Sequence, residues 1–140
     1  MYRDHPVPGA AVTAPVQAPT DATFSRPIEP DPVLLFRYSA LTFNAHRIHY
    51  DRPYATGVEG YPGLIVHGPL IATLLVDLVR RELPAARIRR FEFKAASPLF
   101  DTQPFSVCGR LEANAAGGSV ALWACNHEGA LAMHARAELA

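Results

Sequence analysis

The strongest hydrophobic pattern in the chain lies near its middle and predicts a helix. Apolar residues recur there at steps of three and four positions, as in an α-helix, at Leu70, Ile71, Leu74, Leu75, Leu78 and Val79. Ala72 and Val76 make much of the opposite face apolar too, so we expect a helix that is buried on nearly all sides. The helix is expected to begin at Gly68-Pro69 and to stop before Pro84.

Downstream of this helix, apolar residues alternate with polar and charged ones, which is the pattern of strands with one buried face. Four such segments are predicted, namely Ile88–Ala95, Gln103–Glu112, Ser119–Asn126 and Ala130–Glu138. Turn-forming residues connect the last three, at Asn114–Gly118 and at His127–Gly129. A long central helix wrapped by three or four antiparallel strands is an α+β architecture.

The N-terminal part has a different character, because seven of the 13 prolines lie in the first 32 residues. Proline lacks a backbone donor, so we expect residues 1–32 to be an extended arm or linker, with a short edge strand around Ala11–Thr13 at most. Val33–Leu41 then has helical spacing, with Asp31 as a cap and Pro32 in the first turn. The predicted organisation is therefore a Pro-rich arm, 1–32, and one domain, 33–140.

Composition excludes several functional classes. The chain has 140 residues and is formally neutral, with 13 basic and 13 acidic side chains, so nothing favours a nucleic acid or an anionic membrane as partner. It has no apolar run long enough to span a membrane and no signal peptide, and we expect a cytoplasmic protein. Cys108 and Cys125 are too few for a disulfide scaffold or a zinc site, and are typical of ordinary intracellular thiols.

The candidate chemistry lies in the polar segment before the central helix. His49 is the side-chain type best suited to pass a proton near neutral pH, and Asp51, two positions on in an expected extended segment, would share its face. The backbone N–H of Gly68 opens the helix at the positive end of its dipole, where it can stabilise an enolate oxygen. His46 and His49 also have the spacing of a metal pair, but the signal is weak and we expect no metal.

These residues carry a resemblance to a known family. The segment from about Phe36 to Leu75 resembles the hydratase motif of MaoC-like proteins, an Asp-x-Asn-Pro-x-His-x-Asp loop followed by His-Gly at the start of a central helix. The chain has Asn-Ala-His-Arg-Ile-His-Tyr-Asp at 44–51 and His-Gly at 67–68. The sequence of this motif is most similar to that of the branch that contains mesaconyl-C4-CoA and itaconyl-CoA hydratases and mitochondrial 3-hydroxyacyl-thioester dehydratases. The resemblance implies a hot-dog fold, in which an antiparallel sheet wraps a long helix.

The same resemblance implies an activity: reversible addition of water to the double bond of an α,β-unsaturated acyl-CoA. Coenzyme A would be part of the substrate, with no separate cofactor. By position, His49 matches the catalytic histidine and Gly68 the residue whose N–H binds the thioester oxygen. Asp51, His46 and His67 would support them.

The chain departs from the family pattern at the catalytic Asp, because Asn44 stands there and His46 replaces the usual Asn. An amide cannot act as a general base. We therefore expect a mainly one-base scheme in which Asn44 holds the water and His49 deprotonates it. His49 would then return a proton to Cα, while Gly68 stabilises the enolate oxygen.

Coenzyme A brings phosphate groups, which arginine binds well. Arg52 and Tyr54 in the motif loop are candidates for substrate binding, as are three arginines that follow the central helix, Arg87, Arg89 and Arg90. Each of these arginines is equally explained as a solvated surface charge.

Size predicts a partner. In the similar branch the full protein has two hot-dog halves with the motif in the C-terminal half, and Met1-Tyr2-Arg3-Asp4 resembles the end of a preceding domain. A single hot dog leaves an open sheet edge and an incomplete acyl pocket. We therefore expect a homodimer, or a heterodimer with a second hot-dog half.

Three other functions stay open at this point. A dehydratase of fatty-acid synthesis would run the same chemistry in reverse. A hot-dog thioesterase would need an acid on the central helix, where Asp77 is the only interior one and lies more than two turns from Gly68. A non-catalytic or half-site subunit would depend on a partner half for activity.

Overall fold

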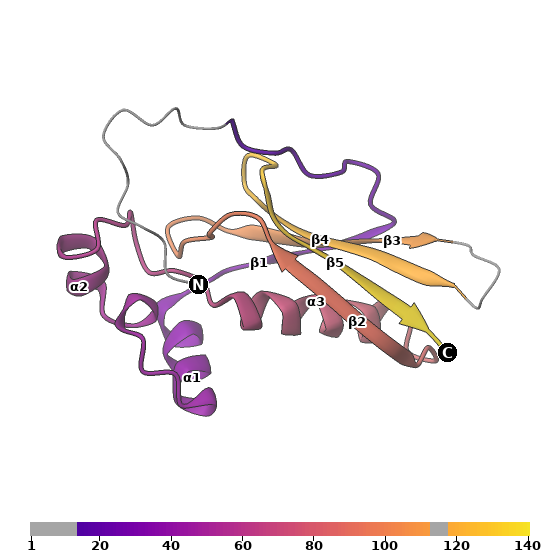
Figure 1. Ribbon diagram of the computed structural model, residues 1–140, viewed down its shortest axis with the longest axis horizontal. Coiled ribbons are helices and arrows are strands. Elements are labelled where there is room, and N and C mark those ends of the chain that lie inside the picture. Colours follow the sequence, from indigo (N-terminus) through magenta and orange to yellow (C-terminus); the bar gives the residue numbers. More distant parts are fainter. Residues whose placement is uncertain (1–13, 113–117) are drawn as a thin grey trace.

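A five-stranded antiparallel sheet packs against one long helix (Figure 1). The computed structural model describes residues 14–112 and 118–140. The strands are β1 (Phe24–Ile28), β2 (Ile88–Ala95), β3 (Phe105–Glu112), β4 (Ser119–Asn126) and β5 (Leu131–Leu139), in the spatial order β1-β3-β4-β5-β2. Helix α3 (Gly68–Glu82) lies along one face of this sheet. This is the arrangement that the hot-dog resemblance implies.

The core forms where α3 meets the inward face of the sheet. The helix buries one side through Leu70, Ile71, Ala72, Leu75, Leu78 and Val79. The strands supply apolar side chains at alternate positions, such as Val107 on β3, Leu122 on β4 and Met133 on β5, each no more than 1% exposed. The predicted helix bounds and the strands at 88–95 and 119–126 are confirmed, since both patterns are local.

The expected boundary at residue 32 is wrong, because β1 lies inside the proposed arm and pairs with β3. Pro27 hid this strand in the sequence, and it is tolerated because β1 is at the edge of the sheet. Gly109 opposite makes room for the strand, since a Cβ there would lie 2.2 Å from the Phe24 ring. The sheet thus has five strands instead of three or four.

The rest of the described arm, residues 14–23, lies on the face of the sheet opposite α3 (Figure 1). Backbone hydrogen bonds hold it there, from Ala18 N to Gly129 O at 2.9 Å and from Thr23 N to Gly109 O at 2.8 Å. The edge strand expected at residues 11–13 lies outside the described residues, as does most of the turn expected at 114–118.

Three short elements gather at the N-terminal end of α3 (Figure 1). Helix α1 (Pro32–Thr42) begins as predicted, with the Asp31 carboxylate accepting hydrogen bonds from the N–H groups of Val33 and Leu34. The segment that we expected to be a loop contains a 3₁₀ turn, η1 (Arg47–His49), and helix α2 (Arg52–Gly57). Within the described residues, no helix is long and apolar enough to cross a membrane.

Candidate active site

His49 is buried at the end of η1, and its hydrogen bonding defines its tautomer. The side chain is 8% exposed, and its Nδ1 lies 2.7 Å from the carbonyl oxygen of Ile65. A carbonyl only accepts, so Nδ1 carries the proton and the lone pair of the neutral ring is on Nε2. No residue in the described part of the chain bonds that Nε2. It is therefore the nitrogen available to act as a base.

The segment that carries Ile65 is itself held from two sides. Ile65 N donates to Ile48 O at 3.0 Å, and Val66 N donates to Leu99 O at 2.9 Å.

Burial lowers the pKa of His49, the nearby His46 lowers it further, and the bond to Ile65 opposes this effect. His49 is consequently the neutral base at neutral pH.

His67, the last residue before α3, stacks on His49. The ring centroids are 3.8 Å apart and the planes differ by 16°. His67 is 1% exposed, and its Nε2 lies 2.8 Å from the Oγ of Ser39, a buried residue of α1. Burial first, and then the neighbouring His49, lowers the pKa of His67 to about 4. Sequence reasoning missed Ser39, and the only signal was a polar residue inside an apolar helix.

Gly68 begins α3 directly after His67, as predicted. Its backbone N–H forms no hydrogen bond with the residues that the structure describes, and it lies at the positive end of the helix dipole. Gly68 also takes a helical conformation immediately before Pro69, where a side chain would be disfavoured. The backbone conformation before Pro69 thus explains why a glycine is found at position 68, and the Gly68 N–H remains available as a donor beside the stacked histidines.

Asn44 follows Phe43, which ends α1 in the left-handed conformation with a φ of 52°. The Asn44 Oδ1 accepts a hydrogen bond from the His46 N–H at 3.0 Å. Its NH₂ group makes no bond to any described residue, so it is free to donate to a ligand. The His46 ring lies edge-on to His49 at 5.6 Å.

The extended segment that was predicted to place Asp51 on the same face as His49 does not form, because His49 ends the 3₁₀ turn η1 and only Asp51 itself has extended backbone angles. Asp51 caps α2 by accepting from Tyr54 N at 3.1 Å, and it pairs with Arg47 at 2.8 Å. Chiefly through Arg47, its pKa is held below the ordinary value. Asp51 therefore stabilises the loop and is not bonded to His49.

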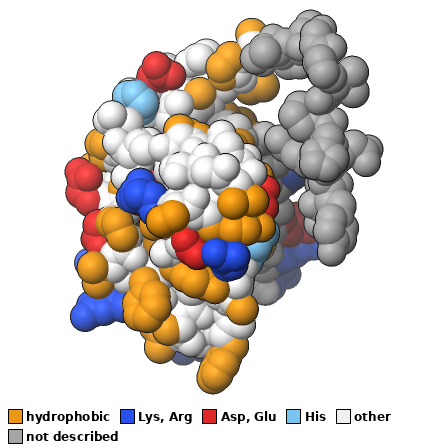
Figure 2. Space-filling model, turned by 90° about the vertical axis from the view of Figure 1, so that its left-hand side faces the viewer, with side chains coloured by type: hydrophobic (Ala, Val, Ile, Leu, Met, Phe, Trp, Pro, Cys, Tyr) orange, Lys and Arg blue, Asp and Glu red, His pale blue; other side chains and the backbone are white. Residues whose placement is uncertain are grey.

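A pocket of about 300 Å³ opens beside Asn44. Its lining is mostly apolar and consists of Phe36, Ser39, Ala40, Phe43, Asn44, Ala45 and Tyr50. Figure 2 views this end of the molecule, where hydrophobic side chains gather on the lower part of the face; Phe36 is 60% exposed and Phe43 95%. The pocket reaches the stacked histidines through Ser39, which lines it and also bonds His67.

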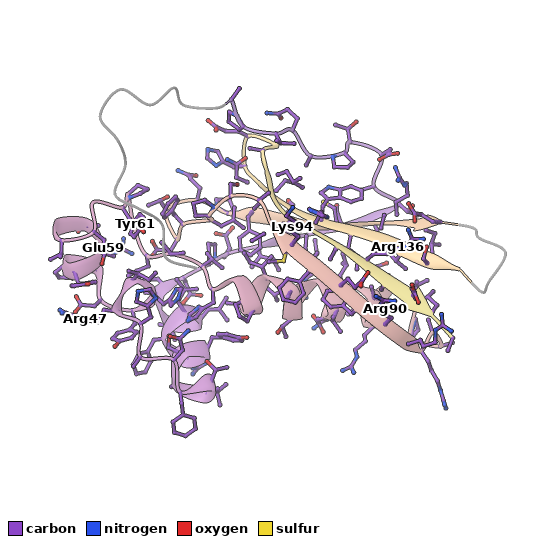
Figure 3. All side chains as sticks on the ribbon, viewed as in Figure 1. Arg47, Glu59, Tyr61, Arg90, Lys94 and Arg136 are labelled. Carbon is purple, nitrogen blue, oxygen red and sulfur yellow. The ribbon has the colours of Figure 1, made fainter. Side chains whose placement is uncertain are left out.

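The two predicted binding residues of the motif loop are engaged in contacts of their own. Arg52 forms an ion pair with the buried carboxylate of Asp101. The Tyr54 hydroxyl donates to Glu59 at 2.8 Å, and the Arg47 guanidinium lies 4.1 Å from the centre of the Tyr54 ring. Figure 3 shows Arg47 and Glu59 at this end of the molecule and Arg90 at the other.

The three arginines after α3 differ from one another. Arg89 pairs with Glu138 and Arg90 with Glu92. Arg87 has no ion-pair partner among residues 14–112 and 118–140, and it lines a pocket of about 440 Å³ together with Arg80, which is likewise unpaired there. Sequence reasoning named Arg87 and missed Arg80, because only the fold brings the two together.

A third pocket, of about 330 Å³, connects these arginines to the site. It lies between α3 and β2 and is lined by Tyr38, Pro69, Ala72, Thr73, Val76, Phe91 and Phe93. Val76 and Phe91 also line the arginine pocket, so the two form one groove. The groove begins beside Gly68-Pro69 and ends at Arg80, about 18 Å along the helix.

Comparison with known proteins agrees with this geometry. Residues 1–101 match the family model of hydroxyacyl-thioester dehydratase type 2. The chain belongs to this family. It is 50% identical to the mesaconyl-C(4)-CoA hydratase of Chloroflexus aurantiacus, over 99% of this chain and 48% of that protein. It is 46% identical to the mitochondrial hydroxyacyl-thioester dehydratase type 2 of Schizosaccharomyces pombe, over 56% of this chain and 27% of that protein.

Solved structures show the same fold at low identity. The ChsH1–ChsH2 complex of Mycobacterium tuberculosis matches with a TM-score of 0.74 and 19% identity, over 91% of this chain and 98% of that chain. The (R)-hydratase of A. caviae matches with a TM-score of 0.73 and 18% identity, over 91% and 96%. This family member thus has the hot-dog fold and spans about half the length of the curated relatives that it matches.

Proposed function

We propose that this chain is the catalytic half of a hydro-lyase that adds water reversibly to the double bond of an α,β-unsaturated acyl-CoA. The observation that carries this proposal is the pairing of a neutral His49, with Nε2 free, and the unpartnered N–H of Gly68. A base for water and a donor for the thioester oxygen are the two groups that such a hydration needs. The names of the relatives at 50% and 46% identity agree with this chemistry.

The reaction can be written with these residues alone. The Asn44 NH₂ donates to the oxygen of a water molecule, and His49 Nε2 takes a proton from it as the oxygen attacks Cβ. The electron pair of the double bond moves onto the thioester oxygen, where the Gly68 N–H and the dipole of α3 stabilise the enolate. The imidazolium then gives its proton to Cα, which regenerates neutral His49 and completes the addition of H and OH.

The pockets supply places for the two ends of the substrate. The apolar pocket beside Asn44 would take the acyl group. The groove between α3 and β2 would take the pantetheine arm, with the phosphates at Arg80 and Arg87. The 50% identity to mesaconyl-C(4)-CoA hydratase, over 99% of this chain, favours a mesaconyl-C4-CoA-like substrate.

A second candidate is dehydration of 3-hydroxyacyl thioesters, and one observation favours it. The pocket proposed for the acyl group has no basic side chain in its lining, so none of the described residues there would neutralise the free carboxylate of a mesaconyl group. An uncharged acyl chain fits such a lining better. A thioesterase is disfavoured, because both Arg26 and Arg81 hold the Asp77 carboxylate at 2.7 Å.

A partner half belongs to this proposal. Among the described strands, β2 pairs only with β5, so its other edge can form hydrogen bonds with a further strand. The groove beside it is open, and the curated relatives are about twice as long as this chain. We propose that a second copy or a separate hot-dog half binds at this edge, and a chain that is active only with such a half would be a half-site subunit.

The test is a hydration assay on a series of enoyl thioesters. Mesaconyl-C4-CoA, crotonyl-CoA and longer enoyl-CoAs are supplied to the wild type and to His49→Ala, with and without the partner half, and double-bond absorbance and free CoA are followed. Hydration that falls about 100-fold or more in His49→Ala supports the proposal. His127→Gln, which changes a histidine in an exposed turn, should leave the rate unchanged. Equal rates in wild type and His49→Ala, or release of free CoA, would contradict it.

A further inference from the structure

Ser39, His67 and His49 form a continuous buried row drawn from three different elements. Ser39 is on α1, His49 ends η1, and His67 precedes α3. The Ser39 Oγ and the His67 Nε2 are 2.8 Å apart, and the two imidazole rings are stacked. Tyr38 adds an edge contact to His67, with the ring centroids 4.9 Å apart. We infer that Ser39 and His67 are positioning residues, which hold the His49 ring with Nδ1 on Ile65 and Nε2 toward the substrate.

Two contacts restrain the His49 ring, and the second depends on Ser39 and His67. The bond from Nδ1 to Ile65 O fixes one edge of the ring, but a single hydrogen bond leaves rotation about its axis. The stacked His67 covers one face and removes that freedom. His67 can do so only if it is fixed itself, and the bond to Ser39 fixes it. These contacts hold the Nε2 of His49 in one orientation, and a small change in the orientation of a catalytic group reduces the reaction rate strongly.

The Ser39 hydroxyl suits this role because it can donate or accept. The His67 Nδ1 is buried without a hydrogen-bond partner. A buried unpaired N–H is more costly than a buried unpaired acceptor. We therefore expect His67 to carry its proton on Nε2 and to donate it to Ser39. An apolar residue at position 39 would leave this proton unpaired as well.

The row also excludes charge from the neighbourhood of His49. The titratable groups that face it are His46 and His67, and Tyr38 faces His67. Among the described residues, no carboxylate is bonded or ion-paired to either stacked ring. A protonated His49 thus has no counter-ion, so it returns its proton readily to Cα. In a site where Asn44 replaces an acid, a neutral stacked ring suits a single base that must both take and return a proton.

The test rests on the proposed function for its kinetic part only. In the full chain with ¹⁵N-labelled histidine, NMR gives the tautomer and the titration of His49 directly, without any substrate. The variants are Ser39→Ala, His67→Gln and His67→Phe, with Ser39→Thr as the conservative rescue that keeps a hydroxyl. Folding is checked by the dispersion of the amide spectrum, and His67→Phe keeps a stacked ring if His67→Gln fails to fold.

In the wild type we expect His49 to show the Nδ1–H tautomer and to titrate below the ordinary range. In Ser39→Ala and His67→Gln we expect mixed tautomers and titration at higher pH, with kcat about 10- to 100-fold lower and KM little changed. Ser39→Thr should recover most of the tautomer signal, whereas His67→Phe, which can stack on His49 but cannot bond Ser39, should recover only part of it. Unchanged tautomer and titration in both Ser39→Ala and His67→Gln would overturn the inference, whatever the rate. Shifted tautomers in a protein without hydration activity would support positioning and contradict only the proposed reaction.

Discussion

The two ends of helix α3 differ in whether the polar groups there have hydrogen-bond or ion-pair partners. At the N-terminal end, His49 Nε2, His67 Nδ1 and the Gly68 N–H lie in or beside the core without partners among the described residues. At the C-terminal end, charged side chains are exposed or half-buried, and the carboxylate among them that is least exposed, Asp77, is paired with Arg26 and Arg81. Leaving a buried polar group unpaired costs free energy, whereas an exposed ion pair changes stability little. The unpaired end is therefore where function explains the structure.

After His49→Ala, the largest loss of rate expected within the site is that of an Asn44 variant. Asn44→Ala removes the amide that we propose to hold the water, and kcat should fall about 10- to 100-fold. Asn126→Ala is the matched control, because Asn126 Oδ1 likewise accepts backbone N–H groups, from Glu128 and Ala130, in a turn that has no role in the proposed reaction. Steady-state kinetics on the best enoyl-CoA should show the loss in Asn44→Ala alone. Equal losses in both variants would mean that Asn44 acts only as a turn residue.

The buried histidines should make stability depend on pH. The pKa of His67 is about 4 in the folded protein and about 6.5 when unfolded, so between these values the unfolded chain binds the extra proton. Stability from this source is complete above pH 6.5 and is lost as the pH falls toward 4, by about 2 kcal/mol at pH 5. Urea unfolding at pH 7 and pH 5 measures the loss.

His67→Phe is the informative variant for this dependence, since it keeps a ring but cannot titrate. It should lose clearly less stability than the wild type between pH 7 and pH 5. His127→Gln, in an exposed turn, should behave as the wild type does. A His67→Phe variant with the full acid sensitivity would show that another group accounts for it.

The same contrast explains what could be predicted from the sequence. Helix α3 and strand β2 were predictable because each rests on periodicity within a few turns or residues. The contact between Ser39 and His67 joins positions 28 apart, and no local pattern reveals it. Helix α2 was missed because its capping residue, Asp51, is also a turn former.

The register of strand pairing likewise determines which of the three predicted arginines finds an ion-pair partner. Arg89 and Arg90 looked equivalent to Arg87 in the sequence, but strand pairing places Glu138 beside Arg89. Of these three arginines, only Arg87 has no ion-pair partner among the described residues. A charge that appears free in a sequence can therefore be assigned to a ligand only once the neighbouring strand is known.

Arg80 and Arg87, at the C-terminal end of α3, have no ion-pair partner among the described residues, and Arg87 provides the next test. If Arg80 and Arg87 bind the phosphates of coenzyme A, Arg87→Ala should raise KM about 5- to 10-fold and leave kcat unchanged. Arg110→Ala is a control on the far strand β3, where Asp21 and Glu112 pair with the arginine. An unchanged KM in Arg87→Ala, with substrate well below saturation, would place the phosphates elsewhere.

The smallest expected effect is at Asp77. Asp77→Asn breaks the ion pairs with Arg26 and Arg81. Because the Asp77 side chain is 37% exposed, the free energy of unfolding should fall by about 1 kcal/mol or less. Hydration should stay within about threefold of the wild type, because the nearest reacting group lies more than two helical turns away. Denaturant midpoints and initial rates with crotonyl-CoA measure both. A loss of hydration as large as that of Asn44→Ala would show that the charged end of α3 takes part in catalysis, and the division between its two ends would no longer hold.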